Sequence, residues 1–372
     1  MPALYVLILI PLLFYIILPL IGAFRVRSVW RQFRLTMINA SLFPICTYGE
    51  IIGDRKEGYF RFFGEIESIQ SRKLLWVKNK NMTMTVKMEH CFVYLIPSEK
   101  KMNSQMPTKL SWNRVFSIAE GTAVYISGEV REEDGRLLFA GDRKNPLTVI
   151  IYDGEESSLL ERSISCGRQK NEYWNFLTPW SIAIGGILSL VLLNMMIQAN
   201  VPAEFLIGGI LVAALPILPF LPPGLFFFFL YTAFWRRGRN CRADRDLIAL
   251  PLRFEDRNIF AREYRHIRFG SGQPFMPVEP GYKVRGIHYP GKEKKTLWDH
   301  SLFGAEIQKE SGSFIGRPLD PMKEFLLIED EPRSLIMRST AKAFLFEILA
   351  MTSILSALTI NIWLIILIFQ SL

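Results

Sequence analysis

The sequence predicts an α+β membrane protein with four transmembrane helices and two soluble regions. Four apolar stretches are each long enough to cross a hydrocarbon core about 30 Å thick, which takes about 20 residues. The segments between them are polar and contain short, partly alternating β-type runs separated by turn residues. The chain has 372 residues, is 50% hydrophobic and carries a formal net charge of +9.

The apolar stretches place the transmembrane helices at 1–24, 179–198, 205–235 and 343–370. For the first stretch, the alternative is a cleaved signal peptide. Such a peptide starts with a charged region and ends at an A-x-A-like site, and this stretch has neither apart from the amino terminus itself. We therefore expect an uncleaved anchor.

Basic residues orient these helices. The 199–204 turn and the carboxyl terminus hold almost no basic residues, whereas arginines gather at the opposite ends. The positive-inside rule then predicts a multi-pass cytoplasmic-membrane protein with both soluble regions in the cytoplasm and both termini outside. The clusters also predict contact with anionic lipid headgroups, and they make nucleic-acid binding the less favoured explanation of the net charge. Their members are Arg25, Arg27, Arg31, Arg34, Arg236, Arg237, Arg239, Arg242 and Arg245.

The third span is interrupted by prolines, which remove backbone donors and kink or break a helix. A broken helix is typical of transport sites, although a structural kink explains the same pattern. Glu347 is the only charged residue within a span, and it lies about one turn from the cytoplasmic end, within reach of water or Lys342. We expect polar span residues such as Asn361 to bond between helices. The prolines are Pro216, Pro219, Pro222 and Pro223.

The first soluble region is expected to hold a basic juxtamembrane link at 25–58, an OB-like β-barrel domain at 59–165 and a juxtamembrane helix at 166–178. Six or seven short strands within about 100 residues favour a small antiparallel barrel. Its aromatic residues Trp112, Tyr125 and Phe139 would suit a stacking platform for single-stranded nucleic acid. We prefer to interpret them as core residues.

The run EGTAVYISGEV, from Glu120 to Val130, and the order span, small β domain, span resemble the GIDE or BAM-type domain of membrane-anchored ubiquitin ligases and their bacterial relatives. The resemblance covers residues 55–200. Those ligases end in a RING of paired Cys and His zinc ligands, which this chain lacks, so ligase activity is not implied. The four cysteines (Cys46, Cys91, Cys166 and Cys241) have no C-x-x-C spacing and indicate neither a disulfide framework nor a zinc site.

The second soluble region, 236–342, is predicted to be smaller and mainly β. Its end, residues 312–339, has the same order of features as residues 135–163. Both windows run from a glycine and a short apolar run through a Pro-containing loop to an apolar strand (VIIYD or LLIED), an acidic turn and S-L-[LI]-x-R-S. Our hypothesis is an internal tandem repeat in which each half runs span, soluble domain, span. The alternative is that any strand–turn–helix approach to a membrane looks like this.

No catalytic or nucleotide-binding motif occurs, and we expect no enzyme, cofactor or metal. Asp299, His300 and Glu306 would suit an acid/base cluster, but a solvated loop is the preferred interpretation. The predicted function is a non-catalytic membrane scaffold or assembly protein that binds a protein partner through its β domain. The alternative is a small transporter or channel component that uses the broken third span. Self-association is left open.

Overall fold

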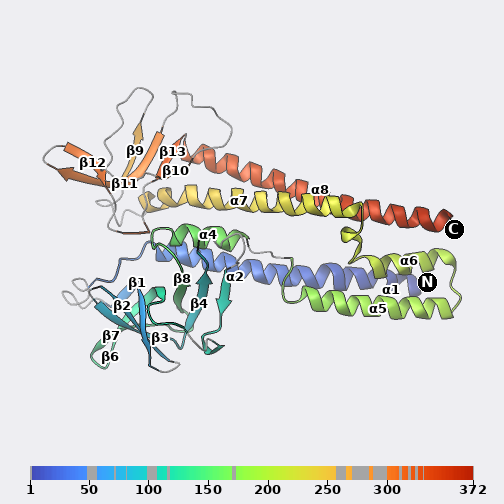
Figure 1. Ribbon diagram of the computed structural model, residues 1–372, viewed down its shortest axis with the longest axis horizontal. Helices are drawn as coiled ribbons and strands as arrows, with labels where there is room; N and C mark the ends of the chain where they lie inside the picture. Colours follow the sequence, from blue (N-terminus) through green and yellow to red (C-terminus); the bar gives the residue numbers. More distant parts are fainter. Residues whose placement is uncertain are drawn as a thin grey trace. The chain divides into compact units, whose positions relative to one another are not determined.

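The computed structural model describes residues 2–47, 57–70, 73–80, 82–98, 107–114, 118–169, 173–256, 265–269, 285–287, 300–309, 312–316, 320–322, 326–329 and 331–371 (Figure 1). The fold is α+β. The chain forms two compact units, which we describe separately. The membrane unit contains residues 1–32, 169–242 and 339–372, and the soluble unit contains residues 33–168 and 243–338.

Three helical segments are long and apolar enough to cross a membrane: Tyr5–Ala40, Thr178–Gln198 and Pro332–Ser371. The first consists of α1 (Pro2–Ile10), the π-helical η1 (Pro11–Ile17) and α2 (Leu18–Ala40). The second is α5 and the third is α8. The predicted span at 205–235 is instead divided among the short apolar helix α6 (Ala203–Ala214), the 3₁₀ turn η4 (Leu218–Phe220) and the start of α7 (Gly224–Asp256).

Helices extend beyond the apolar stretches that predicted them. The expected link at 25–58 is helical as far as Ala40, and α7 continues to Asp256, inside the expected second soluble domain. Helix α8 begins at Pro332 rather than near 343, and α4 (Leu159–Gln169) begins before the expected juxtamembrane helix at 166. Hydropathy marks only the part of a helix that suits lipid. Packing against other protein elements stabilises the polar continuation.

Helix α5 packs closely against η1 in the membrane unit. A Cβ atom on Gly185 would lie 2.7 Å from Phe14 Cβ, so only glycine fits there. Ser189, one turn further along α5, lies 3.3 Å from the Tyr15 hydroxyl. Pro19 has no N–H to bond the Tyr15 carbonyl, and the Tyr173 hydroxyl donates to that carbonyl at 2.8 Å. The small-residue face of α5 and polar groups near its start therefore stabilise a helix interrupted by proline.

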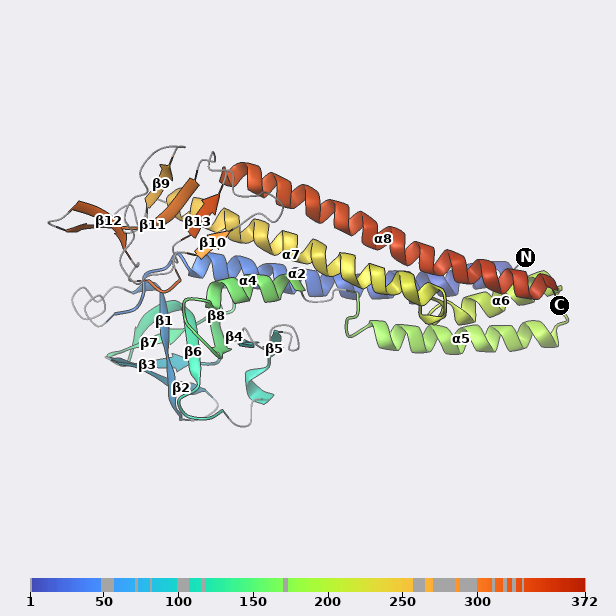
Figure 2. The same ribbon diagram turned by 45° about the horizontal axis from the view of Figure 1, so that its top comes forward.

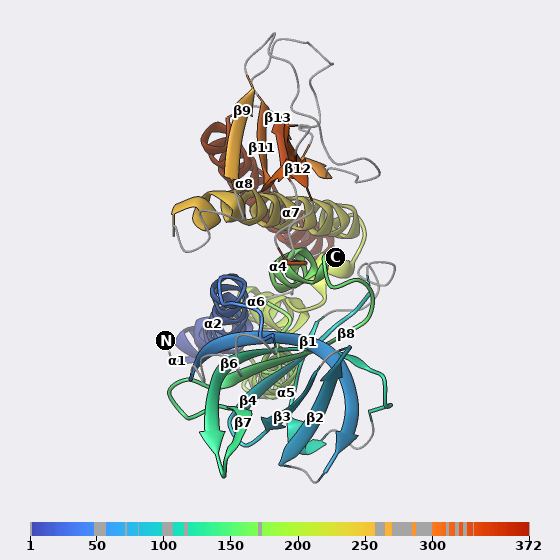
Figure 3. The same ribbon diagram turned by 90° about the vertical axis from the view of Figure 1, so that its left-hand side faces the viewer.

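Five strands of the soluble unit close into a barrel: β1 (Gly58–Ile69), β2 (Leu74–Asn79), β3 (Met82–Lys87), β7 (Arg136–Ala140) and β6 (Ala123–Glu133), which returns to β1. Figure 3 shows these strands curving around a common interior. All pairs are antiparallel except β3–β7. Alternate residues such as Phe62, Val77, Ile126 and Phe139 fill the barrel, as the period of two requires.

The sheet extends from β6 through β8 (Leu147–Tyr152) and β4 (Cys91–Ile96) to β5 (Thr108–Leu110). Every residue of β8 is buried, which fits its unbroken apolar sequence. The outer face of this part of the sheet is packed as well. The Phe63 and Tyr125 rings lie 4.9 Å apart, and Phe33 of α2 lies 4.3 Å from Tyr94 of β4. The sheet is thus covered on both faces here.

The aromatic residues proposed for stacking are placed by this packing. Phe139 points into the barrel core, and Tyr125 lies on the covered outer face; both are completely buried. Trp112 lies in the turn η3 (Trp112–Arg114) and packs partly against the core. They form no common surface, and their interpretation as core residues is the one that this packing favours.

The second sheet has five strands: β9 (Arg265–Phe269), β10 (Arg285–Ile287), β11 (His300–Lys309), β12 (Gly312–Gly316) and β13 (Leu326–Glu329). Strand β11 pairs antiparallel with β9, β12 and β13, and β13 pairs in parallel with β10. In the first sheet, β6 likewise pairs antiparallel with β1, β7 and β8, and β8 pairs in parallel with β4. The two sheets therefore share neighbours and directions for five strands.

The register of one strand pair also agrees between the two sheets. Val124 faces Ile151 across β6 and β8, and Ser301 faces Ile328 across β11 and β13. The same offset in residue number relates Val124 to Ser301 and Ile151 to Ile328. This offset also aligns the strand sequences VIIYD and LLIED.

Candidate functional site

The predicted basic clusters divide into exposed and internal arginines. Exposed side chains are those of Arg25, Arg27, Arg31, Arg236 and Arg237. The Arg25 guanidinium lies 5.8 Å from the Phe176 ring centroid, near the exposed Trp174 and Trp180 at the start of α5. Basic and aromatic side chains in this combination are typical of a membrane–water interface. The prediction of lipid contact now concerns only the exposed arginines, because the other four make contacts within the protein.

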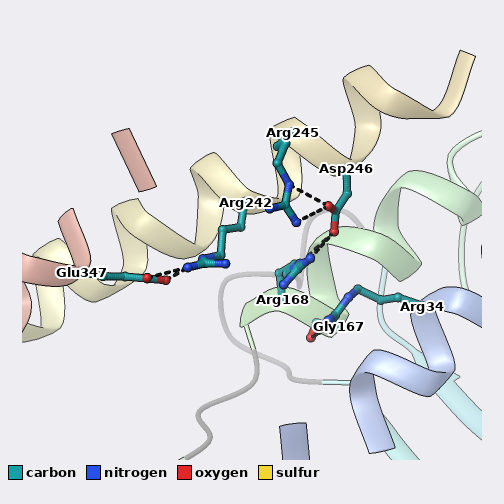
Figure 4. A network of polar contacts seen from close by, with 7 residues as sticks. All are labelled: Arg34, Gly167, Arg168, Arg242, Arg245, Asp246 and Glu347. Carbon is teal, nitrogen blue, oxygen red and sulfur yellow. Dashed lines mark hydrogen bonds and ion pairs between the residues drawn. The ribbon is translucent and has the colours of Figure 1, made fainter. Parts of the chain in front are cut away.

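Arg34 is one of the internal arginines. It is buried on α2, and its Nη1 donates to the Gly167 carbonyl at 2.7 Å, in the last turn of α4 (Figure 4). Orphan carbonyls at a helix carboxyl terminus favour a cation. A Cβ atom on Gly167 would lie 3.0 Å from Arg34 Cγ, so the glycine makes room for the arginine. Arg34 therefore joins α2 to α4 within the soluble unit.

Arg245 contacts Asp246, the next residue of α7, at 2.7 Å. Asp246 also accepts two hydrogen bonds from Arg168 of α4, from Nε at 2.8 Å and Nη2 at 2.5 Å (Figure 4). One carboxylate thus balances two guanidinium groups. These contacts link α4 to α7 within the soluble unit and leave Arg245 a structural role.

Arg242 and Glu347 form a two-pronged ion pair between α7 and α8 in the membrane unit, with distances of 2.6 and 2.5 Å (Figure 4). Glu347 was expected to reach water or Lys342, and it pairs instead with Arg242. Figure 2 shows α7 and α8 side by side. Gly238 permits this approach, since its Cβ position lies 3.5 Å from Glu347 Cγ. The buried Arg239 lies 4.3 Å from the Trp235 ring centroid.

The proline-rich interruption between α6 and α7 is capped by a side chain of α8. Buried Asn361 donates from Nδ2 to the Leu218 carbonyl at 2.5 Å and to the Leu221 carbonyl at 2.9 Å. Each of these carbonyls also accepts a backbone N–H, from Leu221 and Leu225 respectively, so Asn361 adds a second donor to each. Gly224 starts α7 at this point, where a Cβ atom would lie 2.1 Å from Asn361 Nδ2. Asn361 bonds between elements, as the sequence predicted. Pro216, Pro219, Pro222 and Pro223 all lie within the interruption between α6 and α7.

A buried ionic cluster in the soluble unit was missed by the sequence reasoning. Arg61 of β1 is completely buried and pairs with Asp320, which precedes β13. Arg61 Nε donates to the Phe43 carbonyl at 2.7 Å. Tyr125 lies beside them, and its burial raises its pKa to about 12, against the opposing effect of the Arg61 charge. The available signal was an arginine inside the aromatic strand run YFRFF.

Side chains suited to metal binding or nucleophilic catalysis do not converge in the described ranges. No group of three or more His, Cys, Asp or Glu side chains occurs there that could hold a metal ion. Burial raises the pKa values of Cys91 and Cys166 to about 11, so both thiols stay protonated at neutral pH. His300 and Glu306 lie on β11 rather than in a loop, and Asp299 falls outside the described residues.

No family model, curated protein or solved structure matches the chain.

Proposed function

We propose that the protein is a non-catalytic integral membrane scaffold that binds a protein partner through its cytoplasmic β domain. One contrast carries the proposal. The outer face of β1, β6 and β8 is covered inside the soluble unit, as buried Phe63, Tyr125 and Ile150 show. Across the barrel, outward side chains of β2 and β3 are half-buried or exposed. The covered face holds the domain together, and the open face is available to a partner.

We propose further that the barrel is OB-like. Five strands close in the order β1-β2-β3-β7-β6, with β3–β7 as the one parallel pair, which supports this assignment. OB-folds bind ligands on the face of their second and third strands and on the adjacent loops. In this chain that face is formed by β2 and β3, so the fold and the exposure indicate the same surface. We call it the β2–β3 face.

The charges of the β2–β3 face favour a protein partner over a polyanion. Glu67 accepts from Thr83 at 3.3 Å and lies 3.9 Å from Lys78. Trp76 is at the centre, paired in register with Ser68 and Thr85. Acidic and basic groups alternate around one aromatic side chain. Tryptophan is enriched at the energetic centre of protein interfaces, whereas nucleic acid requires a predominantly basic surface.

We propose that the two soluble regions are copies of one unit. The shared order and direction of β1, β4, β6, β7 and β8 with β9 to β13 support the duplication, as does the common register of the pairs β6–β8 and β11–β13. Each sheet also follows a helix that leaves the membrane unit, and each is followed by a helix, α4 or α8. The proposed repeat is therefore span, β domain, span, with the third span assembled from α6, η4 and the start of α7.

The proposed orientation follows from this repeat. Both β domains lie in the cytoplasm, and both termini lie outside. The exposed arginines support it, because in the sequence Arg25, Arg27 and Arg31 of α2 and Arg236 and Arg237 of α7 come between an apolar stretch and the residues of the soluble unit. There they would contact anionic headgroups, with about 1 kcal/mol for each basic residue.

Site-specific photocrosslinking in membranes tests the proposed function. A photoreactive residue at Trp76 is expected to capture a discrete protein, and one at Leu95, exposed on β4, serves as the control. Trp76→Ala is expected to reduce co-purification of that protein about tenfold or more, since central tryptophans dominate interfaces. Capture from Leu95 alone, or unchanged co-purification of Trp76→Ala, would contradict the assignment. The mass of the purified complex separates a different protein from a second copy.

The alternative is a transporter or channel component that uses the interrupted span. The interruption places a helix start within the membrane unit, as transport sites do. Asn361, however, already occupies the Leu218 and Leu221 carbonyls, which favours a structural role. Stabilisation of the purified protein by one solute, abolished in Asn361→Ala, would favour transport instead.

A further inference from the structure

Arg61 occupies an unusual position for an arginine in a barrel strand. Strand β1 alternates between the barrel interior, which takes Phe60 and Phe62, and the outer face, which takes Arg61 and Phe63. An outward arginine normally reaches water. Here the outer face is covered, and the Arg61 side chain has no exposed surface. A buried guanidinium needs a carboxylate, because an unpaired charge in such a place is strongly destabilising.

The carboxylate comes from the second soluble region rather than from the barrel. Asp320 Oδ2 accepts from Arg61 Nη2, and Asp320 Oδ1 accepts from the Met322 backbone N–H at 3.0 Å. Asp320 is itself buried, with 6% of its side chain exposed. The Asp320 carboxylate therefore bridges its own turn and the barrel, and it reaches Arg61 across 259 residues of sequence.

The site contains more donors than this one carboxylate uses. Arg61 Nη1 is buried and has no hydrogen-bond partner within the described part of the chain. The Tyr125 hydroxyl is buried beside it, within reach of Ser127. Ser127, paired with Arg61 in register and 3% exposed, adds a further hydroxyl on the same face. Donors of this kind, converging in a dry site, are typical of carboxylate recognition.

We propose that the outer face of β1 and β6 carries a carboxylate-binding site built from Arg61, Tyr125 and Ser127, and that Asp320 is its internal ligand. The second soluble region is held on the barrel by this ligand-like contact. A free carboxylate can therefore occupy the site when the Asp320 side chain is removed. The proposal does not depend on the scaffold function.

Chemical rescue in the full-length, detergent-purified protein tests the site. Asp320→Ala is expected to lower the melting temperature of the soluble unit by about 6–12 °C, because it leaves a buried arginine unpaired. Sodium formate at about 0.2 M is expected to restore about 1–3 °C, as a weak ligand that binds only the folded state does. Sodium chloride at the same concentration is expected to restore nothing.

Two further variants control for general effects of the salt. Asp142→Ala removes a side chain from the corresponding loop between β7 and β8, where Asp142 is partly exposed and lies 3.5 Å from Arg131. It is expected to show a small shift that formate does not alter. Arg61→Met combined with Asp320→Ala removes the receptor as well as the ligand, so formate is expected to have no effect.

Asp320→Asn keeps the side-chain size and the oxygen that accepts from the Met322 N–H. It therefore tests the same ion pair if Asp320→Ala fails to fold. It is expected to melt below the wild type because the charge is missing. A wild-type melting temperature for Asp320→Asn would overturn the proposal. Equal responses of folded Asp320→Ala to formate and chloride would do the same.

Discussion

The two β sheets of the soluble unit share five strands and differ in what surrounds them. In the first sheet, β2 and β3 close the ring between β1 and β7, and β5 extends the opposite edge. Within the described residues, the second sheet consists of the five shared strands alone. In the sequence, the shared strands are followed by a helix, α4 or α8, and then by residues of the membrane unit. The additional strands of the first sheet create the β2–β3 face, so the proposed binding function belongs to the first sheet only.

Truncation of equivalent core side chains is the strongest test of this comparison. The offset in residue number that aligns the strand pair β6–β8 with β11–β13 makes Ile126 equivalent to Phe303. Both side chains are completely buried. We expect Phe303→Ala to lower the free energy of unfolding by about 3–5 kcal/mol and Ile126→Ala by about 2–4 kcal/mol. Denaturant titration of the purified protein measures both values. A neutral Phe303→Ala would break the comparison, because the second sheet would lack a core where duplication requires one.

The next largest effect concerns the interruption before α7. Asn361→Ala leaves the Leu218 and Leu221 carbonyls without their side-chain donor, and we expect a loss of about 1–3 kcal/mol. Thermal unfolding in detergent measures it, and Gly224→Ala is expected to act in the same direction because its Cβ would displace Asn361. In the other half of the chain, Tyr173 has the corresponding role at Pro19. Wild-type stability of Asn361→Ala would mean that the two halves satisfy their interrupted helices differently.

Two adjacent glycines of α5 provide a matched pair. A Cβ atom on Gly185 would meet Phe14 and Tyr15 at 2.7 Å, whereas one on Gly186 would meet nothing within 4 Å. Gly185→Ala is expected to cost about 1–3 kcal/mol by overpacking, and Gly186→Ala is expected to be neutral or stabilising by up to about 1 kcal/mol. Parallel thermal melts compare them. Equal stabilities would show that α5 does not pack on η1 through this face.

The smallest effect is expected on the open side of the barrel. Lys87 Nζ and Glu133 Oε2 are 3.1 Å apart on partly exposed side chains. Lys87→Ala should change stability by at most about 1 kcal/mol, and less at high salt. A loss as large as that of Ile126→Ala, measured by the same titration, would indicate that this side is buried in an assembly.

The sequence was sufficient for features that depend on local pattern. Long apolar stretches marked the membrane helices, and the alternation in EGTAVYISGEV marked β6. Closure of the barrel was predicted in outline, but the partners of β3 were not, because a parallel pair leaves no short turn in the sequence. Helix ends were misplaced at Ala40, Asp256 and Pro332, where packing rather than hydropathy sets the boundary.

The site residues show the same limit. A positive-inside count treats all arginines alike, yet three of these arginines bond within the protein. Arg34 bonds to Gly167 and Arg242 to Glu347, each on another helix. Arg245 bonds to Asp246, the next residue of the same helix. The Arg61–Asp320 pair was not predictable, since its partners are 259 residues apart and neither carries a local motif. Long-range pairing of single polar residues is set by the tertiary fold.

A cysteine-accessibility map of intact cells tests the central claim, that two repeats of the same orientation carry both β domains on the cytoplasmic side. Single cysteines at Lys80, Arg333, Asn200 and Ser371, all exposed positions, would be introduced after removal of the four native cysteines. A membrane-impermeant maleimide is expected to label positions 200 and 371 in intact cells and positions 80 and 333 only after permeabilisation. Labelling of position 80 or 333 in intact cells would contradict the account.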